Sequence, residues 1–589
     1  MLNRTSSLFS SREDYRLFLL SSFVTVVFFT LLLRLFYLQV VRGQDMERRA
    51  KMNSTQVLPL LAPRGLVFAR DGNTDEPLLE NAPRFSLYYS YSDKATTSIE
   101  SIKRELSERL PESFKIIQQK LAEARKSGKI TRVLTDIPSP VALALMERRL
   151  FLPGVNILVE PQRRPRYGFL ACHILGYAGE VDETELRRSR DQGLRHGQWV
   201  GKNGIERVYD ELLRGTDGGL QFEVDAMGRH LQVVRRIPSS PGNDVYLTIN
   251  RRLQSVAEAG LAASISGRGA AVALDPQTGA VLALASAPGY DSSGNLGAYL
   301  SDQALPLFNR AIQGIYPPGS VFKIVTAATG LQDIDWDTRK SFLCTGSYRL
   351  GDREFGCWNK HGQKEFFGAV AFSCNIYFYN IGRALGPDPI EAMAKAFGFG
   401  EKTGIELAGE SSGLVPGRSW KKKVMRQGWF EGDTLNFSIG QGAMTATPLQ
   451  AAVFFAALAN GGTVWRPYVV DRVVSPENKI LFHQNPDPRQ RVVLKETVWA
   501  TLRRAMEGVV LEGSGRGVQR SDLVIGAKTG TAQNPHGEDH SWFTAYAGRP
   551  GQKPGLALAV FVENGGHGSV SAGPIARAMI NEFYPRESL

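Results

Sequence analysis

Ser320 and Lys323 stand three residues apart in the segment YPPGSVFKI, which runs from Tyr316 to Ile324. On a helix, positions i and i+3 lie on one face about one turn apart, so a hydroxyl and an amine with this spacing can act together. Burial in an apolar helix lowers the pKa of a lysine, and the neutral amine can then serve as a general base. The first helical turn also has free N–H groups that can stabilise an oxyanion. This pair is therefore a candidate for serine–lysine acyl transfer.

The same spacing occurs a second time, in Ser419 and Lys422. That copy lies in GRSWKKKV, a basic stretch in which nothing would deprotonate the lysine. The segment SVFKIVTAATGLQ, which begins at Ser320, has an apolar helical pattern instead. We therefore expect Ser320, and not Ser419, to be the nucleophile.

A Ser-x-Asn motif follows the candidate nucleophile. Ser373 and Asn375 lie in AVAFSCNIYFYNIG, which predicts helical segments joined by a short turn. In serine–lysine enzymes of the penicillin-recognising type, a motif of this kind relays protons and holds the substrate amide. A second Ser-x-Asn, at Ser293 and Asn295, comes before the nucleophile in a turn-rich loop. The copy after Ser320 fits the expected chain order.

A Lys-Thr-Gly motif comes last in the chain. It ends the apolar predicted strand LVIGAKTGTA and consists of Lys528, Thr529 and Gly530, followed by Thr531. A lysine and hydroxyls at the end of a strand suit a substrate carboxylate. The other copy, Lys402 to Gly404, follows no strand pattern. Three motifs in order, each in its expected context, predict an acyltransferase or hydrolase.

Three cysteines and one histidine form a separate cluster in the sequence. Their spacing is Cys-x12-Cys-x3-His-x12-Cys, and they are Cys344, Cys357, His361 and Cys374. Three thiolates and an imidazole suit a tetrahedral structural zinc ion. A Cys344–Cys357 disulfide outside the cytoplasm and buried free thiols are the alternatives. The fourth cysteine, Cys172, is expected in the protein core.

The charge of the chain does not point to nucleic acid. The 589 residues carry a formal net charge of +12, with a pI near 9.4. Lys and Arg are spread along the chain, and neither nucleic-acid zinc-finger spacing nor a ribonucleoprotein-like aromatic pattern occurs. We read the excess as a generally basic surface.

Residues 17–41 predict a single membrane anchor. Leu17 to Leu33 is uncharged, and Arg34 can extend its charge to the interface while the span continues to Val41. The segment lacks the short apolar region and small-x-small site of a cleaved signal peptide. Residues 1–16 are then a short cytoplasmic tail, and the remaining residues lie on one side of the membrane.

A linker-like segment, Arg236 to Asp244, divides the rest of the chain. Residues 42–240 are rich in charge and show neither a nucleophile–base pair nor a metal cluster, so we expect a non-catalytic structural or interaction domain. Residues 245–589 alternate strand and helix patterns, and all three motifs lie there.

Further segments across the chain match a known family. They are APRGLVFARDG (62–72), HILGYAGEV (173–181), GKNGIERVYDELLRGTDG (201–218), EVDAMGR (223–229) and NFSIGQGAMTATPLQ (436–450). With the three motifs, they resemble the class B penicillin-binding proteins, and most closely the penicillin-binding protein 2 group of the rod-elongation machinery. The resemblance implies an α+β fold with a transmembrane helix, an elongated mixed α/β pedestal or dimerisation-type domain, and a transpeptidase domain. In that domain helices flank an antiparallel sheet, as in serine β-lactamases.

The resemblance also implies an activity, peptidoglycan D,D-transpeptidation in cell elongation and rod-shape maintenance, with β-lactams as inhibitors. Ser320 would attack the carbonyl between the terminal D-alanines, and Lys323 would take its proton. Ser373 would relay that proton to the leaving amine beside Lys528, and Asn375 would hold the donor amide. The terminal carboxylate would be bound by Lys528, Thr529 and Thr531. The oxyanion hole would be formed by the backbone N–H groups of Ser320 and Thr531.

The chemistry implied by the resemblance needs no cofactor, and Zn²⁺ would be structural only. Some members of the group have a zinc site in the same loop, with Asp where this chain has Cys344 and Cys357, and this departure leaves the metal open. The implied substrates are stem peptides ending in D-Ala-D-Ala, and the implied partners are the glycan polymerase RodA, MreC and other elongation-complex proteins. The implied location is the bacterial inner membrane, with the catalytic domain on the periplasmic side. Alternatives are an anchored β-lactamase, a β-lactam sensor, a division-type class B protein and a non-catalytic scaffold.

Overall fold

The computed structural model divides the chain into two compact units. It describes residues 12–44, 55–72, 74–89, 96–127, 130–148, 151–152, 154–188, 194, 198–224, 230–293, 296–534 and 537–586. Unit 1 comprises residues 1–61, 83–161 and 217–240, and unit 2 comprises 62–82, 162–216 and 241–589. The non-catalytic region expected over 42–240 is thus shared between the units. Residues 1–11 of the expected tail and 225–229 of EVDAMGR lie outside the described residues.

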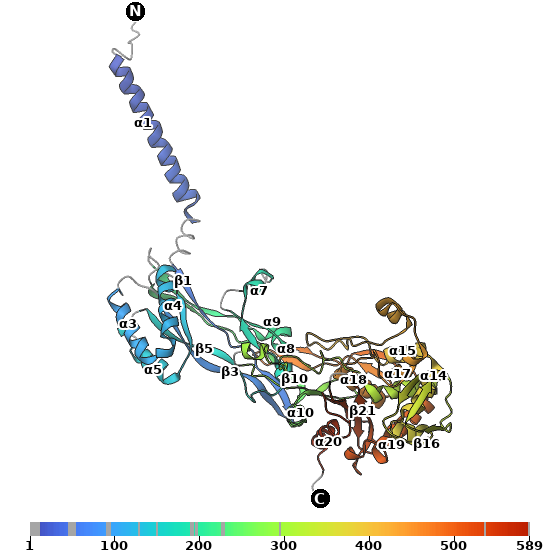
Figure 1. Ribbon diagram of the computed structural model, residues 1–589. Coiled ribbons are helices and arrows are strands. Elements are labelled where there is room, and N and C mark those ends of the chain that lie inside the picture. The colour runs from blue at the N-terminus through green and yellow to red at the C-terminus, as the bar shows by residue number, and fades with distance from the viewer. Residues whose placement is uncertain are drawn as a thin grey trace, which may run out of the picture. The chain divides into compact units, whose positions relative to one another are not determined.

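Residues 12–41 form one uninterrupted helix (Figure 1). Helix α1 (Arg12–Phe36) continues as a π-helical turn over Tyr37–Val41. The stretch Tyr15–Val41 is long and apolar enough to cross a membrane, and its side chains are exposed. It includes the whole of the predicted anchor.

Beyond the N-terminal helix, the described residues of unit 1 include a three-stranded sheet, further paired strands and three α-helices. Strands β1 (Thr55–Leu60), β8 (Gly218–Val224) and β9 (His230–Ile237) form an antiparallel sheet. The second half of β3 (Thr74–Tyr89) pairs with β4 (Thr131–Ile137), and β3 also pairs with β5 (Val155–Pro165). Helices α3 (Thr96–Arg109), α4 (Phe114–Ser127) and α5 (Ser139–Glu147) complete the unit, and their core includes Leu87, Ile102, Leu106, Ile117 and Leu121.

Unit 2 is built on a five-stranded antiparallel sheet. Its order is β12 (Val281–Ala287), β11 (Gly269–Leu274), β23 (Leu556–Val562), β22 (His540–Gly548) and β21 (Val524–Ala532). Every residue of β11 and β23 is buried. Because alternate side chains of a strand point to opposite faces, both faces of this sheet must be covered.

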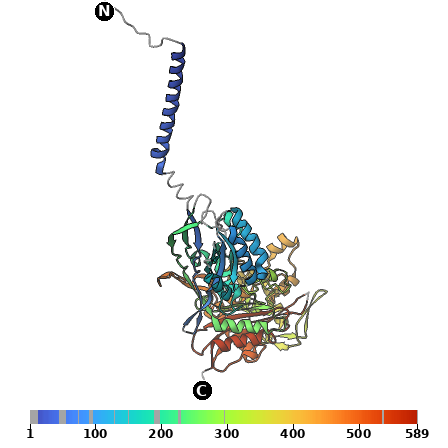
Figure 2. The same cartoon turned by 90° about the vertical axis from the view of Figure 1, so that its left-hand side faces the viewer.

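Helices cover the sheet. Helix α10 (Arg251–Ala262) packs against α20 (Ala572–Phe583), and Figure 2 shows α10 in green beside the red C-terminal segment. Helix α18 (Pro448–Asn460) packs on β11, β22 and β23, and α19 (Glu496–Leu511) packs on β21. Asn250 caps α10 by accepting from the N–H of Leu253, which fixes the start of this helix directly after β10 (Asp244–Asn250). The predicted α+β class is confirmed.

The other elements of unit 2 are shorter or lie beside this core. Strands β19 (Ile480–His483), β18 (Val470–Val474), β10, β2 (Val67–Asp71) and the start of β3 pair side by side in that order. Before residue 301 follow α6 (Cys172–Leu175), β6 (Ala178–Glu180), α7 (Glu183–Arg188), β7 (Trp199–Gly201), α8 (Gly204–Val208), α9 (Asp210–Leu213) and α11 (Gly297–Leu300). After it come α12 (Lys323–Asp333), β13 (Phe342–Cys344), β14 (Ser347–Leu350), β15 (Arg353–Gly356), β16 (Gly362–Lys364), α13 (Phe366–Ala371), α14 (Asn375–Leu385), α15 (Pro387–Ala396), α16 (Arg418–Trp420), α17 (Glu431–Ser438), β17 (Thr463–Trp465) and β20 (Pro488–Arg491).

Candidate active site

Ser320 lies in a 3-10 turn, Gly319–Phe322, that leads directly into α12. Gly319 has φ +53°, and a Cβ there would come within 2.6 Å of the carbonyl oxygen of Thr531. Only glycine fits so close an approach at a positive φ. The turn is thereby held against the strand of the third motif, and Ser320 remains half-buried at a cleft.

Lys323 is fully buried and lies beneath the second motif. Its Nζ donates to the backbone oxygen of Ser373 at 2.7 Å, to Ser373 Oγ at 3.2 Å and to Asn375 Oδ1 at 2.6 Å. Burial lowers the pKa of Lys323 to about 8, while the neighbouring thiols oppose the shift. Within the part of the chain that is described, no hydrogen bond joins Lys323 to Ser320 Oγ. Catalytic hydrogen bonds often tighten only when substrate binds.

Ser373 stands between the two lysines. Its Oγ accepts from Lys528 Nζ at 2.9 Å as well as from Lys323 Nζ at 3.2 Å. The residue occupies the turn between α13 and α14 with φ +56°, a left-handed conformation that is strained for a serine. Strain of this kind is characteristic of functional positions. The hydroxyl is therefore held where it can pass a proton from one amine to another group.

The third motif is part of strand β21, which pairs with β22 along its whole length. Lys528 is fully buried, and burial together with the charge of Lys323 lowers its pKa well below the ordinary value. Thr529 shares a 2.6 Å hydrogen bond with the hydroxyl of Ser514. Gln441 Nε2 donates to the backbone oxygen of Thr531 at 3.3 Å. The strand thus presents hydroxyls to the cleft above a buried amine.

A cleft of about 810 Å³ joins the three motifs. Ser320, Ser373, Asn375, Thr529 and Thr531 all line it. Gly530 is buried in β21 behind this wall. An acyl-transfer centre needs a nucleophile, a proton carrier and carboxylate donors around one space, and this cleft brings them together.

The cysteine cluster predicted from the sequence forms in space. The ligand atoms of Cys344, Cys357, His361 and Cys374 all lie within 4.8 Å of one another, and the cysteines are free thiols. His361 Nδ1 faces the sulfur atoms of Cys344 at 3.5 Å and Cys357 at 3.4 Å. Tetrahedral zinc with thiolate and imidazole ligands would place S and N about 3.6 Å apart. The four side chains therefore fit a zinc ion.

The cluster also contacts the second motif. The backbone N–H of Asn375 donates to Cys357 Sγ at 3.2 Å, and Asn375 Nδ2 donates to the oxygen of Gly356 at 2.9 Å. Asn375 Oδ1 in turn accepts from Lys323. The order of the cysteine loop is thus linked directly to the polar side chains of the cleft.

The duplicate motifs lie elsewhere. Ser419 and Lys422 are exposed on a surface turn. Thr403 is buried in a turn where its N–H and hydroxyl donate to Glu410. The Ser293 copy lies partly outside the described residues, since 294 and 295 are not described. Cys172 is buried as expected, and its sulfur accepts from the N–H of Tyr290.

Several residues that line the cleft were not found from the sequence. Ser514 contacts Thr529 but belongs to a glycine-rich turn without a motif of its own. Trp358 and His567 line the cleft with ring centroids 5.9 Å apart, although they are distant in the chain. In the sequence, the position of Ser514 in a loop before the third motif is only a weak sign of a site residue. The Trp358–His567 pair gives no such sign.

Comparison with known families gives two matches. Residues 269–581 match the penicillin-binding protein transpeptidase domain, and residues 59–247 match the penicillin-binding protein dimerisation domain.

Curated relatives extend over nearly the whole chain. The peptidoglycan D,D-transpeptidase MrdA of Acinetobacter baumannii is 34% identical over 95% of this chain and 86% of its own length. MrdA of Escherichia coli K12 is 30% identical over 94% and 91%. The stage V sporulation protein D of Bacillus subtilis is also 30% identical, over 98% and 85%.

Solved structures show the same fold. The chain is similar to the penicillin-binding protein (PBP2) of Helicobacter pylori in its complex with MreC, with a TM-score of 0.75, 28% identity and coverage of 90% of this chain and 99% of that one. The Pseudomonas aeruginosa PBP2 has a TM-score of 0.66, 29% identity and coverage of 90% and 97%. A peptidoglycan synthase complex that coordinates polymerisation and crosslinking contains a similar chain, with a TM-score of 0.71, 28% identity and coverage of 98% and 99%.

Proposed function

Because this chain belongs to the penicillin-binding protein family, in its penicillin-binding protein 2 group, we propose that it is a peptidoglycan D,D-transpeptidase of cell elongation. Its substrates are stem peptides that end in D-Ala-D-Ala. The observation that carries this proposal is the cleft in which Ser320, Ser373 and the threonines of β21 face one space, with Ser373 hydrogen-bonded to the buried amines of Lys323 and Lys528.

Acylation begins at Ser320. Its Oγ attacks the carbonyl carbon of the penultimate D-alanine, and the neutral amine of Lys323 takes the hydroxyl proton. The N–H groups of Ser320 and Thr531 stabilise the oxyanion, and Asn375 holds the donor amide. The terminal carboxylate binds to Thr529 and Thr531 above the amine of Lys528.

The leaving group receives its proton through Ser373. The Ser373 hydroxyl passes a proton to the nitrogen of the terminal D-alanine as the C–N bond breaks, and it is resupplied from Lys323 at 3.2 Å. The amine of a neighbouring stem peptide then attacks the Ser320 ester. This amine loses a proton through the same groups, a new peptide bond forms, and the Ser320 hydroxyl is restored.

The lifetime of the penicillin adduct separates this function from that of a β-lactamase. With labelled penicillin, we expect the full-length protein in detergent to form one adduct that persists after excess drug is removed, because the proposed transpeptidase transfers its acyl group to an amine and not to water. Intact-protein mass spectrometry over time measures its decay. Loss of the adduct on the timescale of its formation would favour the β-lactamase interpretation.

The cysteine cluster is proposed to hold a structural Zn²⁺. Its ligands would be three thiolates, from Cys344, Cys357 and Cys374, and the Nδ1 atom of His361. Such an ion would contribute folding energy and would fix the loop that contacts Asn375. The chemistry of acyl transfer itself remains with the side chains of the cleft.

Metal analysis tests the zinc proposal independently of activity. We expect close to one zinc per chain in the wild type after dialysis against a weak chelator. The His361→Ala variant should retain much less, because one of four ligands is lost. The His483→Ala variant, which changes an exposed histidine on β19, should match the wild type. Equal and negligible zinc in all three proteins would contradict the proposal and leave free thiols or a disulfide.

The family relationship supports a proposal for the location and the partners of this chain. We propose that α1 anchors the chain in the bacterial inner membrane, with the catalytic domain on the periplasmic side. The H. pylori relative forms a complex with MreC, and another relative is part of a peptidoglycan synthase complex. We therefore propose MreC, other elongation-complex proteins and the glycan polymerase RodA as partners of this chain.

A further inference from the structure

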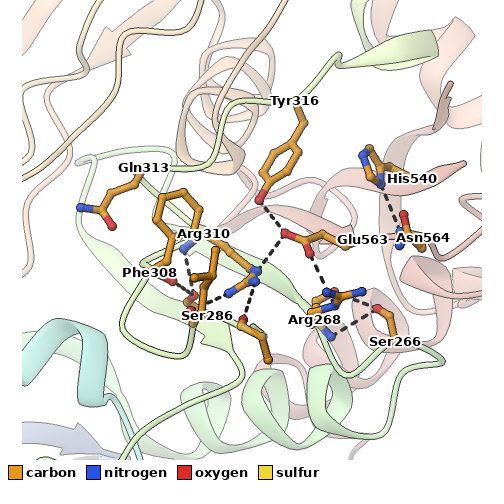
Figure 3. A network of polar contacts seen from close by, with 12 residues as sticks. Ser266, Arg268, Ser286, Phe308, Arg310, Gln313, Tyr316, His540, Glu563 and Asn564 are labelled. Atoms are coloured by element: carbon orange, nitrogen blue, oxygen red, sulfur yellow. Dashed lines mark hydrogen bonds and ion pairs between the residues drawn. The ribbon is translucent and has the colours of Figure 1, made fainter. Parts of the chain in front are cut away.

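A half-buried carboxylate, Glu563, contacts Tyr316, Arg310 and Arg268, which come from three segments of the chain (Figure 3). It directly follows strand β23. Its Oε1 accepts from the hydroxyl of Tyr316 at 2.9 Å and from Arg310 Nε at 2.8 Å, and its Oε2 lies 3.7 Å from Arg268 Nε. The acyl-transfer steps described above use none of these groups.

The arginine partner is itself fixed. Arg310 is 2% exposed, and its Nη atoms donate to the backbone oxygens of Ala304 at 2.8 Å and Leu305 at 3.2 Å. Its N–H donates to Ser286 Oγ on strand β12. The carboxylate of Glu563 is therefore held in place by partners that cannot easily move, and Tyr316 is the partner that leads to the active site.

Tyr316 is held on several sides. Its ring stacks on Phe561 with centroids 3.9 Å apart, and the ring of His540 approaches edge-on at 5.7 Å. Burial and the Glu563 carboxylate raise the pKa of its hydroxyl, so the group is a neutral donor. Its N–H and carbonyl both bond to Ala446, at 3.0 and 2.8 Å.

The link from Tyr316 to Ser320 is short and stiff. Pro317 and Pro318 have fixed φ angles, so a displacement of Tyr316 cannot be absorbed freely before the nucleophile. The carbonyl of Pro317 accepts from Trp542 Nε1 at 3.0 Å, and the N–H of Gly319 donates to the oxygen of Gly440 at 3.0 Å. A displacement of the Tyr316 ring would therefore also move the N–H and Oγ of Ser320.

We propose that Glu563 and Tyr316 are positioning residues that hold the Ser320 turn in the geometry of attack. This inference rests on the proposed acyl transfer at Ser320. Oxyanion donors and nucleophiles act only within a narrow range of positions, so the loss of one supporting hydrogen bond lowers the rate of the chemical step. Substrate binding by the β21 threonines does not depend on this bond.

The test separates binding from chemistry in the full-length protein. Rapid-mixing kinetics with a chromogenic cephalosporin give the initial dissociation constant and the first-order acylation rate. For Tyr316→Phe we expect an acylation rate about five- to tenfold lower at an unchanged dissociation constant, since one hydrogen bond is lost. Tyr299→Phe is the matched control, because this tyrosine also loses one hydrogen bond, which its hydroxyl accepts from the N–H of Asp291.

Two variants of the carboxylate complete the test. Glu563→Ala should lower the acylation rate as Tyr316→Phe does, and the double variant should be no slower than either. Glu563→Gln keeps an acceptor for the tyrosine and should restore most of the rate.

A wild-type acylation rate in Tyr316→Phe would overturn the proposal, and this variant decides the matter if Glu563→Ala does not fold. Multiplying effects in the double variant would also overturn it. The absence of an adduct on the wild type would instead refute acyl transfer itself.

Discussion

Replacing Ser320 with alanine is expected to abolish the covalent penicillin adduct. The Ser320 hydroxyl lies on the turn that packs against Thr531, and it lines the cleft together with the second motif. The methyl group of alanine has no nucleophilic oxygen. The side chain is half-buried and, among the described residues, its Oγ makes no hydrogen bond that supports the fold. We therefore expect an unchanged melting temperature together with complete loss of adduct in intact-protein mass spectrometry.

The chain supplies its own matched control for this experiment. Ser419 has the same three-residue spacing to a lysine, but it is exposed on the surface turn of α16. Ser419→Ala should therefore label like the wild type. A persistent adduct on Ser320→Ala would assign the nucleophile elsewhere, and peptide mapping of the adduct would identify the residue. A loss of adduct that accompanies unfolding would be recognised from the melting temperature.

The elements that carry the three candidate motifs were predictable because their signals are local. The apolar pattern after Ser320 predicts the helix that buries Lys323, and the structure places α12 there with the lysine fully buried. The strand that carries Lys528 and the turn that carries Ser373 were likewise visible in short windows of sequence. The chain order of the motifs then gave their relation to one another.

Contacts between distant segments could not be predicted in this way. Glu563 lies far from Tyr316 in the chain, and a single acidic residue after an apolar strand reads as an ordinary strand end. The same holds for Ser514 and Thr529, whose contact requires knowledge of how a loop folds over β21. The assignment of residues 62–82 and 162–216 to unit 2 was missed for a related reason. Pairing between distant strands, such as β2 with β10, cannot be predicted from local composition.

The cysteine cluster is an intermediate case. The spacing of Cys344, Cys357, His361 and Cys374 predicted a shared site, and the structure brings the ligand atoms together. The sequence could not show that Cys357 accepts from the N–H of Asn375. Through that contact the cysteine cluster is connected to the cleft. A metal ion bound by the cluster would therefore help to hold Asn375 of the second motif in place.

The rate of acylation should rise with pH through about 8. Burial lowers the pKa of Lys323 to about 8, and only the neutral amine can accept the proton of Ser320. At pH 7 about one molecule in ten has a neutral Lys323, so the rate at pH 9 should be close to tenfold higher. A rate that falls or stays level between pH 7 and 9, measured with a cephalosporin that has no titrating group there, would exclude Lys323 as the base.

Lys323→Met removes the base while keeping a long apolar side chain in a buried position. We expect the acylation rate to fall by about 10²- to 10⁴-fold, the usual contribution of a positioned general base, and the rise with pH to disappear. Lys422→Met, in the exposed second copy, should leave both the rate and its pH profile unchanged. If Lys323→Met lowered the rate but kept the same rise with pH, another group would carry the titration, and Lys528 would be the next to test, since its amine also reaches Ser373 Oγ. The profile of the variant thus distinguishes a lysine that accepts the proton from one that only holds Ser373 and Asn375 in place.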